Sequence, residues 1–256
     1  MFRLLDILGR FVLTAIERMG QLMLFGANTV LWTFRPPLRV HAIFDQLEFV
    51  GVKSLFVVIL TGAFTGGVFT LQVYFGFSMF GAESLVGATV ALAMTRELGP
   101  VLTALMVTGR AGSAMAAELG TMRVTEQIDA LYVMAANPVK YLIVPRVLAG
   151  TLMLPLLTTI ATAVGIVGGY LVGVGLLHIN RGIFINNIIQ HIEPWDIFNG
   201  LIKSFVFGFI LALIGCFKGF YAQGGAEGVG RSTTEAVVLA SVLILISDFI
   251  MTAIMF

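Results

Sequence analysis

The sequence predicts an all-α integral membrane protein, in which an N-terminal amphipathic helix at the membrane interface precedes about five transmembrane helices. Two properties of the 256 residues predict this class: 58% are hydrophobic and only 11% are charged. An ordinary soluble domain carries roughly 25% charged residues. A water-soluble fold could not bury this much apolar surface, whereas helices in a bilayer satisfy their own backbone and expose apolar side chains to lipid.

Composition also excludes several kinds of site. The formal net charge is +1, so no large basic surface indicates a nucleic-acid partner. The single cysteine, Cys216, cannot form an internal disulfide or a CxxC motif. The histidines His41, His178 and His191 lack ligand spacing, so no metal site is expected.

Residues 1–49 form the N-terminal region. Polar residues recur there at spacings of three and four, on one narrow arc of a helix: Arg3, Asp6, Arg10, Thr14 and Glu17. This pattern favours a helix in the cytoplasmic interface of the membrane, and the alternative is a helix packed on the protein's own core. Charged residues interrupt any signal-peptide core, and Pro36 and Pro37 end the region.

Residues 50–256 are assigned to a transmembrane domain. Its apolar segments are 52–75, 85–109, 142–177, 198–217 and 235–256, and each is long enough to cross a bilayer. The stretch from Ser232 to Glu235 matches a capping box and is expected to open the last span. Nearby, GAEGVGRS resembles a phosphate-binding loop but follows a span and has Arg231 in place of lysine, so nucleotide binding is rejected.

Basic residues in the short connections predict the orientation. One set of connections holds Arg35, Arg39, Lys53, Arg110, Arg123, Lys140, Arg146, Lys218 and Arg231, and the other set holds only Arg181. The rule places the N-terminus and the basic loops in the cytoplasm and the C-terminus on the far side, a parity that five spans satisfy.

Small residues at helical spacing form two ladders. Ala161, Gly165, Gly169 and Gly173 make one, and Gly62 and Gly66 make a shorter one. Such ladders let helix backbones approach closely. They serve either packing within the chain or a dimer face.

Arg96 and Glu97 lie at the middle of the second span. A charged residue at the bilayer centre costs about 2.5 to 3.5 kcal/mol, so these side chains should face a partner or a wet cavity. Pro100 removes a helix hydrogen bond beside them and should bend the helix. We interpret the charged bend as a substrate cavity, with a structural ion pair as the alternative. Adjacent side chains point about 100° apart, so the two should pair with other helices.

Lys203 and Asp248 form a second charged set within the spans. They lie at comparable depths in the fourth and fifth spans. We expect an interhelical salt bridge with a structural role.

Residues 110–138 read as a cytoplasmic, helix-rich loop. Its polar residues include Glu118, Arg123, Glu126, Gln127 and Asp129. Its apolar face, with Met122, Ile128, Leu131 and Tyr132, suits either docking into another protein or covering the protein's own cytoplasmic surface.

The stretch RELGPVLTALMVTGRAGSAMAAELGTMRVTEQIDAL, residues 96–131, resembles the signature region of the MlaE (YrbE) family of ABC permeases. Supporting stretches are LQVYF at 71–75, PRVLAG at 145–150, LIKSFVFG at 201–208 and the terminus SDFIMTAIMF. The similarity covers most of the chain from residue 50 onward.

The resemblance implies a homodimeric permease of the bacterial inner membrane that moves phospholipid between the inner and outer membranes and so maintains outer-membrane lipid asymmetry. Implied partners are an MlaF-like ATPase that binds ATP and magnesium, an MlaD-like periplasmic MCE-domain protein and an MlaB-like STAS-domain protein. This chain itself would carry no cofactor and no catalytic residue.

The resemblance also implies two sites. A lipid cavity at the dimer interface would include Phe69, Phe77, Phe80, Arg96 and Glu97. The segment from Glu118 to Leu131 would couple to the ATPase. Two other classes stay open: an ion-driven secondary transporter of an amphiphile and a structural anchor for a periplasmic complex.

Overall fold

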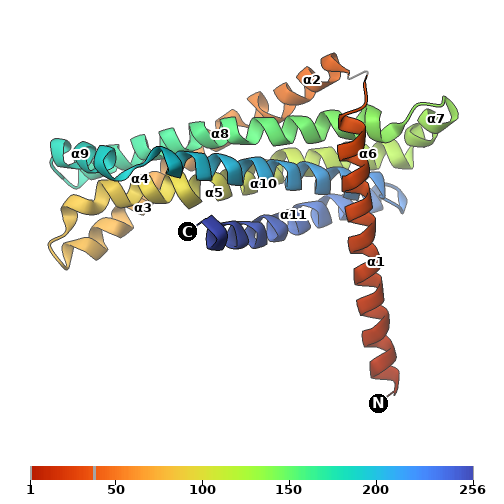
Figure 1. Ribbon diagram of the computed structural model, residues 1–256, viewed down its shortest axis with the longest axis horizontal. Coiled ribbons are helices and arrows are strands. Elements are labelled where there is room, and N and C mark those ends of the chain that lie inside the picture. The colour runs from red at the N-terminus through yellow and green to blue at the C-terminus, as the bar shows by residue number, and fades with distance from the viewer. Residues whose placement is uncertain (1, 37–38, 256) are drawn as a thin grey trace.

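The computed structural model describes residues 2–36 and 39–255, with side chains from residue 13 onward except at 14 and 15. All its regular elements within these ranges are helical (Figure 1). Five helical stretches of the described chain are long and apolar enough to cross a membrane: Val40–Ser78, Glu83–Val124, Val139–Leu176, Pro194–Phe220 and Gly225–Met255. The predicted class, an all-α integral membrane protein, is confirmed.

Several spans are built from consecutive helical pieces. The first joins α2 (Val40–Val50), the 3₁₀ turn η1 (Val52–Ser54) and α3 (Leu55–Ser78). The second joins the 3₁₀ turn η2 (Glu83–Leu85), α4 (Val86–Ala93), the π-helix η3 (Met94–Leu98), α5 (Gly99–Val107), the π-helix η4 (Thr108–Gly112) and α6 (Ser113–Val124). The third joins the π-helix η5 (Val139–Ile143), α8 (Val144–Tyr170) and the π-helix η6 (Leu171–Leu176). The fourth is α10 (Pro194–Phe220), the fifth is α11 (Gly225–Met255), and α7 (Gln127–Val133) and α9 (Arg181–His191) are short connecting helices.

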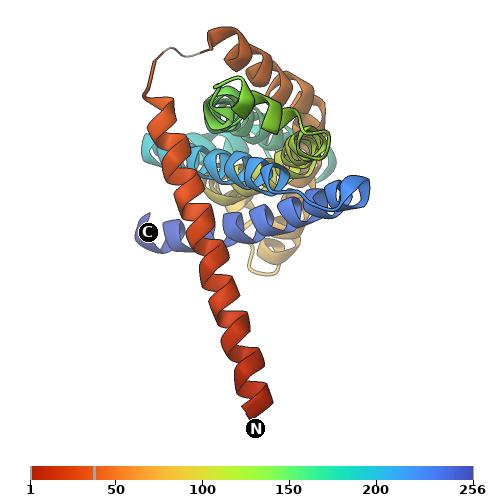
Figure 2. The same ribbon diagram turned by 90° about the vertical axis from the view of Figure 1, so that its right-hand side faces the viewer.

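The N-terminal helix α1 (Phe2–Thr33) runs across the bundle instead of along it, and its first half extends beyond the other helices (Figures 1 and 2). Phe25 is buried against Phe217, Phe220 and Tyr221, which fixes the crossing point. Ahead of it, the large apolar side chains of α1 are mostly exposed: Leu13, Ile16, Met19, Met23 and Leu24. Most of this part of α1 therefore presents its apolar side chains away from the protein's own core, and Leu22 is a residue of it that packs against that core. The side chains of Arg3, Asp6, Arg10 and Thr14 lie outside the described residues.

The core lies along α8, which packs against α3 on one side and α10 on another. The two small-residue ladders face each other across the α3–α8 contact. A Cβ added at Gly62 would lie 2.8 Å from the carbonyl oxygen of Ala161, and one added at Gly66 would collide with the carbonyl of Gly165. These residues of the ladders therefore pack within the chain.

The second span is longer than predicted. Residues 110–124, expected in a loop, continue the helix to Val124, and only α7 stands apart at the end of the bundle (Figure 1). Met115 and Leu119 are fully buried because α6 packs against α10 and α11. Gly219 of α10 permits this contact, because a Cβ added there would lie 2.6 Å from the carbonyl oxygen of Ala116 on α6. Tertiary packing extends a helix that hydropathy alone would end at Gly109.

The last span also begins earlier than predicted. Helix α11 starts at Gly225, so the expected capping box at Ser232 to Glu235 is wrong, and these residues lie inside the helix. Gly224 and Gly225 have φ values of +95° and +67°, which lets the chain turn tightly after α10. The four-residue match to the capping pattern is a weak local signal that this glycine turn overrides.

Candidate functional site: a charged network within the spans

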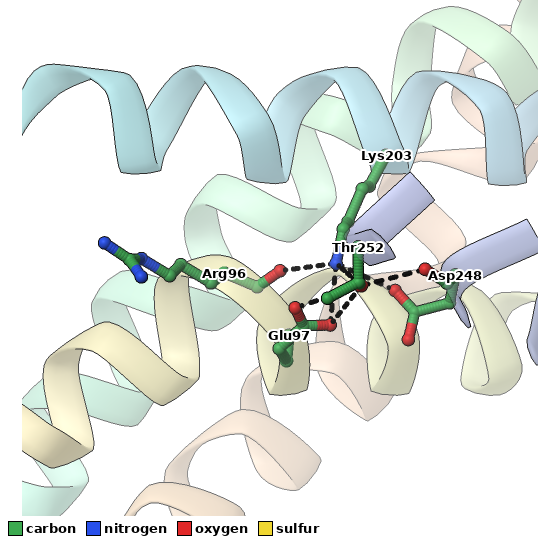
Figure 3. Close-up of polar contacts among 5 residues, drawn as sticks. All are labelled: Arg96, Glu97, Lys203, Asp248 and Thr252. Carbon is green, nitrogen blue, oxygen red and sulfur yellow. Dashed lines mark hydrogen bonds and ion pairs between the residues drawn. The ribbon is translucent and has the colours of Figure 1, made fainter. Parts of the chain in front are cut away.

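Lys203 on α10 connects three of the charged residues that the sequence places inside the spans (Figure 3). Its Nζ donates hydrogen bonds to Glu97 Oε2 at 2.7 Å, to Thr252 Oγ1 at 2.7 Å and to the carbonyl oxygen of Arg96 at 3.2 Å. Asp248 Oδ1 lies 3.0 Å from the same nitrogen, an ion-pair distance without hydrogen-bond geometry. The sequence predicted two separate sets, and the structure joins them into one network.

Burial differs across this network. The Lys203 side chain is 0% exposed, whereas those of Glu97 and Asp248 are 36% and 19% exposed. An ammonium group out of water is costly unless it is paired and hydrogen-bonded, which explains why two carboxylates surround it. With two carboxylates and one ammonium, the cluster has an excess of one negative charge when all three are ionised. The partly exposed Glu97 can therefore exchange its contact with Lys203 for another one, while Lys203 stays buried.

Arg96 turns the other way and meets the start of α10. Its Nε and Nη2 lie 2.7 Å and 2.6 Å from Oδ1 of Asp196. Asp196 is 2% exposed and also accepts a hydrogen bond from the backbone of Glu193, in a capping box that opens α10. As the 100° separation predicts, Arg96 and Glu97 pair with other helices. The sequence reasoning missed Asp196, although Pro194 is typical of a first helical position and signals a helix start here.

The π-helix η3 explains how consecutive residues reach these separate partners. Pro100 has no N–H to donate to the carbonyl of Arg96, so the preceding turn widens from α to π geometry. Lys203 uses the freed carbonyl as an acceptor. Gly200 lets α10 pass directly over this turn, since a Cβ there would collide with the carbonyl of Thr95. The expected bend at Pro100 is thus a π-turn that presents Arg96 and Glu97 on either side of α10.

A small, mainly apolar hollow of about 210 Å³ lies beside this turn, between η3, α8 and α10. Four threonines line part of it: Thr95, Thr158, Thr159 and Thr162. Thr158 is 3% exposed, and its Oγ1 has no hydrogen-bond partner among the described residues. The sequence reasoning missed this group, although threonines at spacings of three and four in a span indicate a polar stripe.

The three phenylalanines expected in the lipid cavity occupy two environments. Phe69 and Phe77 are partly buried and pack against a core cluster formed by Val86, Val90, Met94 and Phe184. Phe80 is 85% exposed at the turn after α3. The two charged residues of the expected cavity, Arg96 and Glu97, lie at η3 on the next span.

The comparisons with known sequences bear on the whole chain. The family described as Permease MlaE matches residues 43–254. The chain belongs to the MlaE permease family. It is 46% identical over 256 residues to a probable ABC transporter permease of Rickettsia conorii, covering 100% of this chain and 99% of that protein. A probable ABC transporter permease of Synechocystis is 49% identical over 212 residues, with 83% and 81% covered.

A third relative has a more specific description. The MlaE permease of the intermembrane phospholipid transport system of Haemophilus influenzae is 41% identical over 255 residues, with 97% of this chain and 96% of that protein covered. The MlaE family match includes every residue of the charged network, from Arg96 to Thr252. The N-terminal helix α1 lies outside it.

The segment expected to couple an MlaE permease to its ATPase is largely internally bonded in the structure. Glu118 Oε2 lies 2.9 Å from Nη2 of the buried Arg146, and Arg123 Nη1 lies 2.6 Å from Asp129 Oδ1. Glu126 adopts a left-handed φ of 60° between α6 and α7, and Gln127 donates to Thr125. These polar contacts fix the position of α7 at the end of the second span.

The apolar side chains of the same MlaE segment divide between two roles. Ile128 is fully buried, and Met122 and Leu131 pack against the main core, so they cover the protein's own surface. Tyr132, Val133 and Met134 are 54%, 88% and 67% exposed. The exposed end of α7 is therefore free to contact another protein. Within the described residues, no group of three His, Cys, Asp or Glu side chains is arranged to hold a metal ion.

Proposed function

We propose that this chain is the membrane-spanning permease subunit of an ABC-type transporter that moves phospholipid between the inner and outer membranes of a bacterium. The observation that carries the proposal is the match along nearly the full length of both chains to the Haemophilus influenzae phospholipid transport permease. ATP would be hydrolysed by a separate MlaF-like ATPase, with ATP and magnesium bound there.

The assembly that we propose has two copies of this chain. Of the five spans, α11 is the least buried, and it exposes large apolar side chains along much of its length: Val238, Val242, Leu245, Ile246, Phe249, Ile250 and Ile254. Glu97 and Thr252 lie where η3 meets α11, so a second copy against α11 would place the charged network beside the interface. An MlaD-like MCE protein and an MlaB-like STAS protein complete the proposed set of partners.

Within this dimer, Arg96 and Glu97 are the proposed headgroup contacts. Both side chains are 36% exposed, next to apolar walls, which suits the polar head and acyl chains of an amphiphile. Phe69, Phe77 and Phe80 would form the outer part of the cavity. Transport needs the lipid to bind differently in two conformations of the permease.

The second span offers a route for that change. One helical stretch, Glu83–Val124, links the turn before α7 to the η3 turn that carries Glu97. A push on α7 and the residues Glu118 to Asp129 by the ATPase would move this stretch against α10. The π-turns η3 and η4 are points where the backbone could change register, because π-bulges interrupt the regular α-helical hydrogen bonding and are frequent at functional sites. Breaking or forming the contact between Glu97 and Lys203 would then open or close the proposed lipid cavity.

The proposed location is the inner membrane, with the N-terminus in the cytoplasm and the C-terminus in the periplasm. Basic residues at the α7 end of the bundle support this orientation through the positive-inside rule. The amphipathic α1, which crosses the bundle at that end, would lie in the cytoplasmic interface (Figure 2).

Reconstitution of the permease with its ATPase in vesicles tests the proposal. We expect ATP-dependent transfer of a fluorescent phospholipid that Arg96→Ala and Glu97→Ala each reduce at least about tenfold, a loss of roughly 1.4 kcal/mol in the transition state. The matched control, Arg181→Ala, removes an exposed arginine of the opposite connection and should transfer lipid normally.

Three outcomes would count against the proposal. Transfer driven by an ion gradient without the ATPase would indicate a secondary transporter. Full transfer by both variants in a normally assembled complex would show that Arg96 and Glu97 do not bind the lipid. The absence of any transfer by the unmodified complex would favour a structural anchor.

A further inference from the structure

A polar cleft of about 680 Å³ lies where α1 crosses the cytoplasmic ends of α10 and α11. Three cations from three different helices line it: Arg18, Lys218 and Arg231. Gln21 and Tyr221 add hydrogen-bonding groups, and Glu235 is the lining carboxylate. The lining of the cleft therefore carries two more positive than negative charges.

The ion pairs inside the cleft do not neutralise all of its positive charge. Glu235 accepts a hydrogen bond from Lys218 Nζ at 2.7 Å, and Arg231 Nε is 3.9 Å from its other oxygen. Arg18 lines the same cleft as this carboxylate. The side chain of Arg231 is 74% exposed, so it can reach a second anion while Lys218 holds Glu235. One carboxylate cannot neutralise three cations, and the cleft favours a further negative charge.

An apolar hollow of about 410 Å³ adjoins the cleft on the other side of α1. It lies between the same three helices and is lined by Leu22, Ala27, Ile210, Leu213 and Leu243, among others. Gln21 of the cleft and Leu22 of the hollow are consecutive, and Phe217 of the cleft is one helical turn from Leu213. Polar cleft and apolar hollow are thus neighbours along α10, with α1 laid across them.

A cationic end beside an apolar end matches the shape of an anionic amphiphile. The position fits too, because α1 crosses the bundle at the end that carries α7 (Figures 1 and 2). The positive-inside rule assigns that end to the cytoplasmic interface, where anionic headgroups attract basic residues. We propose that the cleft and the hollow together bind one anionic phospholipid of the cytoplasmic leaflet, with its phosphate between Arg18 and Arg231 and an acyl chain in the hollow beside α1. The lipid would hold α1 against α10 and α11, a role that is separate from the transported substrate.

Native mass spectrometry of the delipidated full chain, titrated with phosphatidylglycerol or phosphatidylcholine, tests this site. We expect a single tight phosphatidylglycerol adduct whose apparent affinity falls at least about tenfold in Arg18→Gln/Arg231→Gln. The control Arg39→Gln/Lys53→Gln removes the same charge from exposed positions outside the cleft and should change the affinity less than about twofold.

A second variant tests the apolar part. Ala27→Phe adds bulk in the hollow on an exposed face of α1 and leaves every cation in place. It should weaken phosphatidylglycerol binding as strongly as the charge variant, with unchanged thermal melting of the lipid-free chain. Inorganic phosphate should not displace the lipid.

Four results would overturn the proposal. Equal losses of phosphatidylglycerol affinity in the cleft variant and in the charge-matched control would show that the effect comes from overall surface charge. Displacement by inorganic phosphate would indicate a site for a soluble anion. Full phosphatidylglycerol binding by Ala27→Phe would show that the apolar hollow does not hold an acyl chain. Protection of Arg231→Cys from a water-soluble maleimide by the ATPase, and not by phosphatidylglycerol, would assign the cleft to the ATPase; Cys216 is buried and gives no background.

Discussion

Lys203 holds a positive charge in a fully buried position, and its contacts with several partners together offset the free-energy cost of desolvation. Glu97, Thr252, Asp248 and the carbonyl of Arg96 all lie within 3.2 Å of its ammonium group. Removal of one member of a buried ion pair is strongly destabilising, because the other charge stays buried without compensation. The network therefore couples η3, α10 and α11 energetically.

We predict that Lys203→Met lowers the free energy of unfolding by about 3 to 5 kcal/mol. The partly buried Asp248 is then left unpaired, and adding Asp248→Asn should recover part of the loss. Thermal melting in detergent of both single variants and the double variant measures the coupling between the two residues. Strictly additive losses would show that the ion pair has no structural role.

At the scale of elements, close helix contacts depend on residues that lack side chains. Gly66→Ala should lower the free energy of unfolding by about 1 to 3 kcal/mol, because its Cβ would collide with the backbone of Gly165 on α8. Gly76→Ala is the matched control on the same helix, since its added Cβ meets nothing within 4 Å. That variant should be neutral or gain up to about 1 kcal/mol from helix propensity. Equal melting temperatures of the two variants would contradict the packing argument.

The π-turn η3 is a second property of an element. Pro100→Ala restores an N–H that can bond to the carbonyl of Arg96, so the turn can relax to α geometry and redirect Arg96 and Glu97. We expect lipid transfer to fall while the melting temperature stays equal or rises. A variant with normal transfer would show that the π-turn is not needed for function.

At the scale of the whole molecule, orientation in the membrane can be measured directly. Gln127→Cys on α7 and Gln190→Cys on α9 introduce exposed thiols at opposite ends of the bundle, while Cys216 stays buried. In cells with a permeabilised outer membrane, an impermeant maleimide should label position 190 at once. Position 127 should react only after the inner membrane is opened, and the reverse pattern would overturn the proposed topology.

The sequence alone determined the class, the approximate positions of the five spans, and the charged residues inside them. These features are local: a run of apolar residues needs a bilayer wherever it packs, and Arg96, Glu97, Lys203 and Asp248 are conspicuous in such a run. The family resemblance was available for the same reason, because its longest motif is one continuous stretch. Residues 43–254 do match the MlaE permease family.

Only the tertiary structure decided which of these residues meet. Glu97 and Lys203 are 106 positions apart, so no helical period relates them, and Asp196 became the partner of Arg96 through the crossing of α10 over η3. The same packing extended the second span to Val124 and turned the small-residue ladders toward each other. Hydropathy records how much each helix prefers lipid to water, whereas pairing and helix length depend on the shape and charge of neighbours that are distant in sequence.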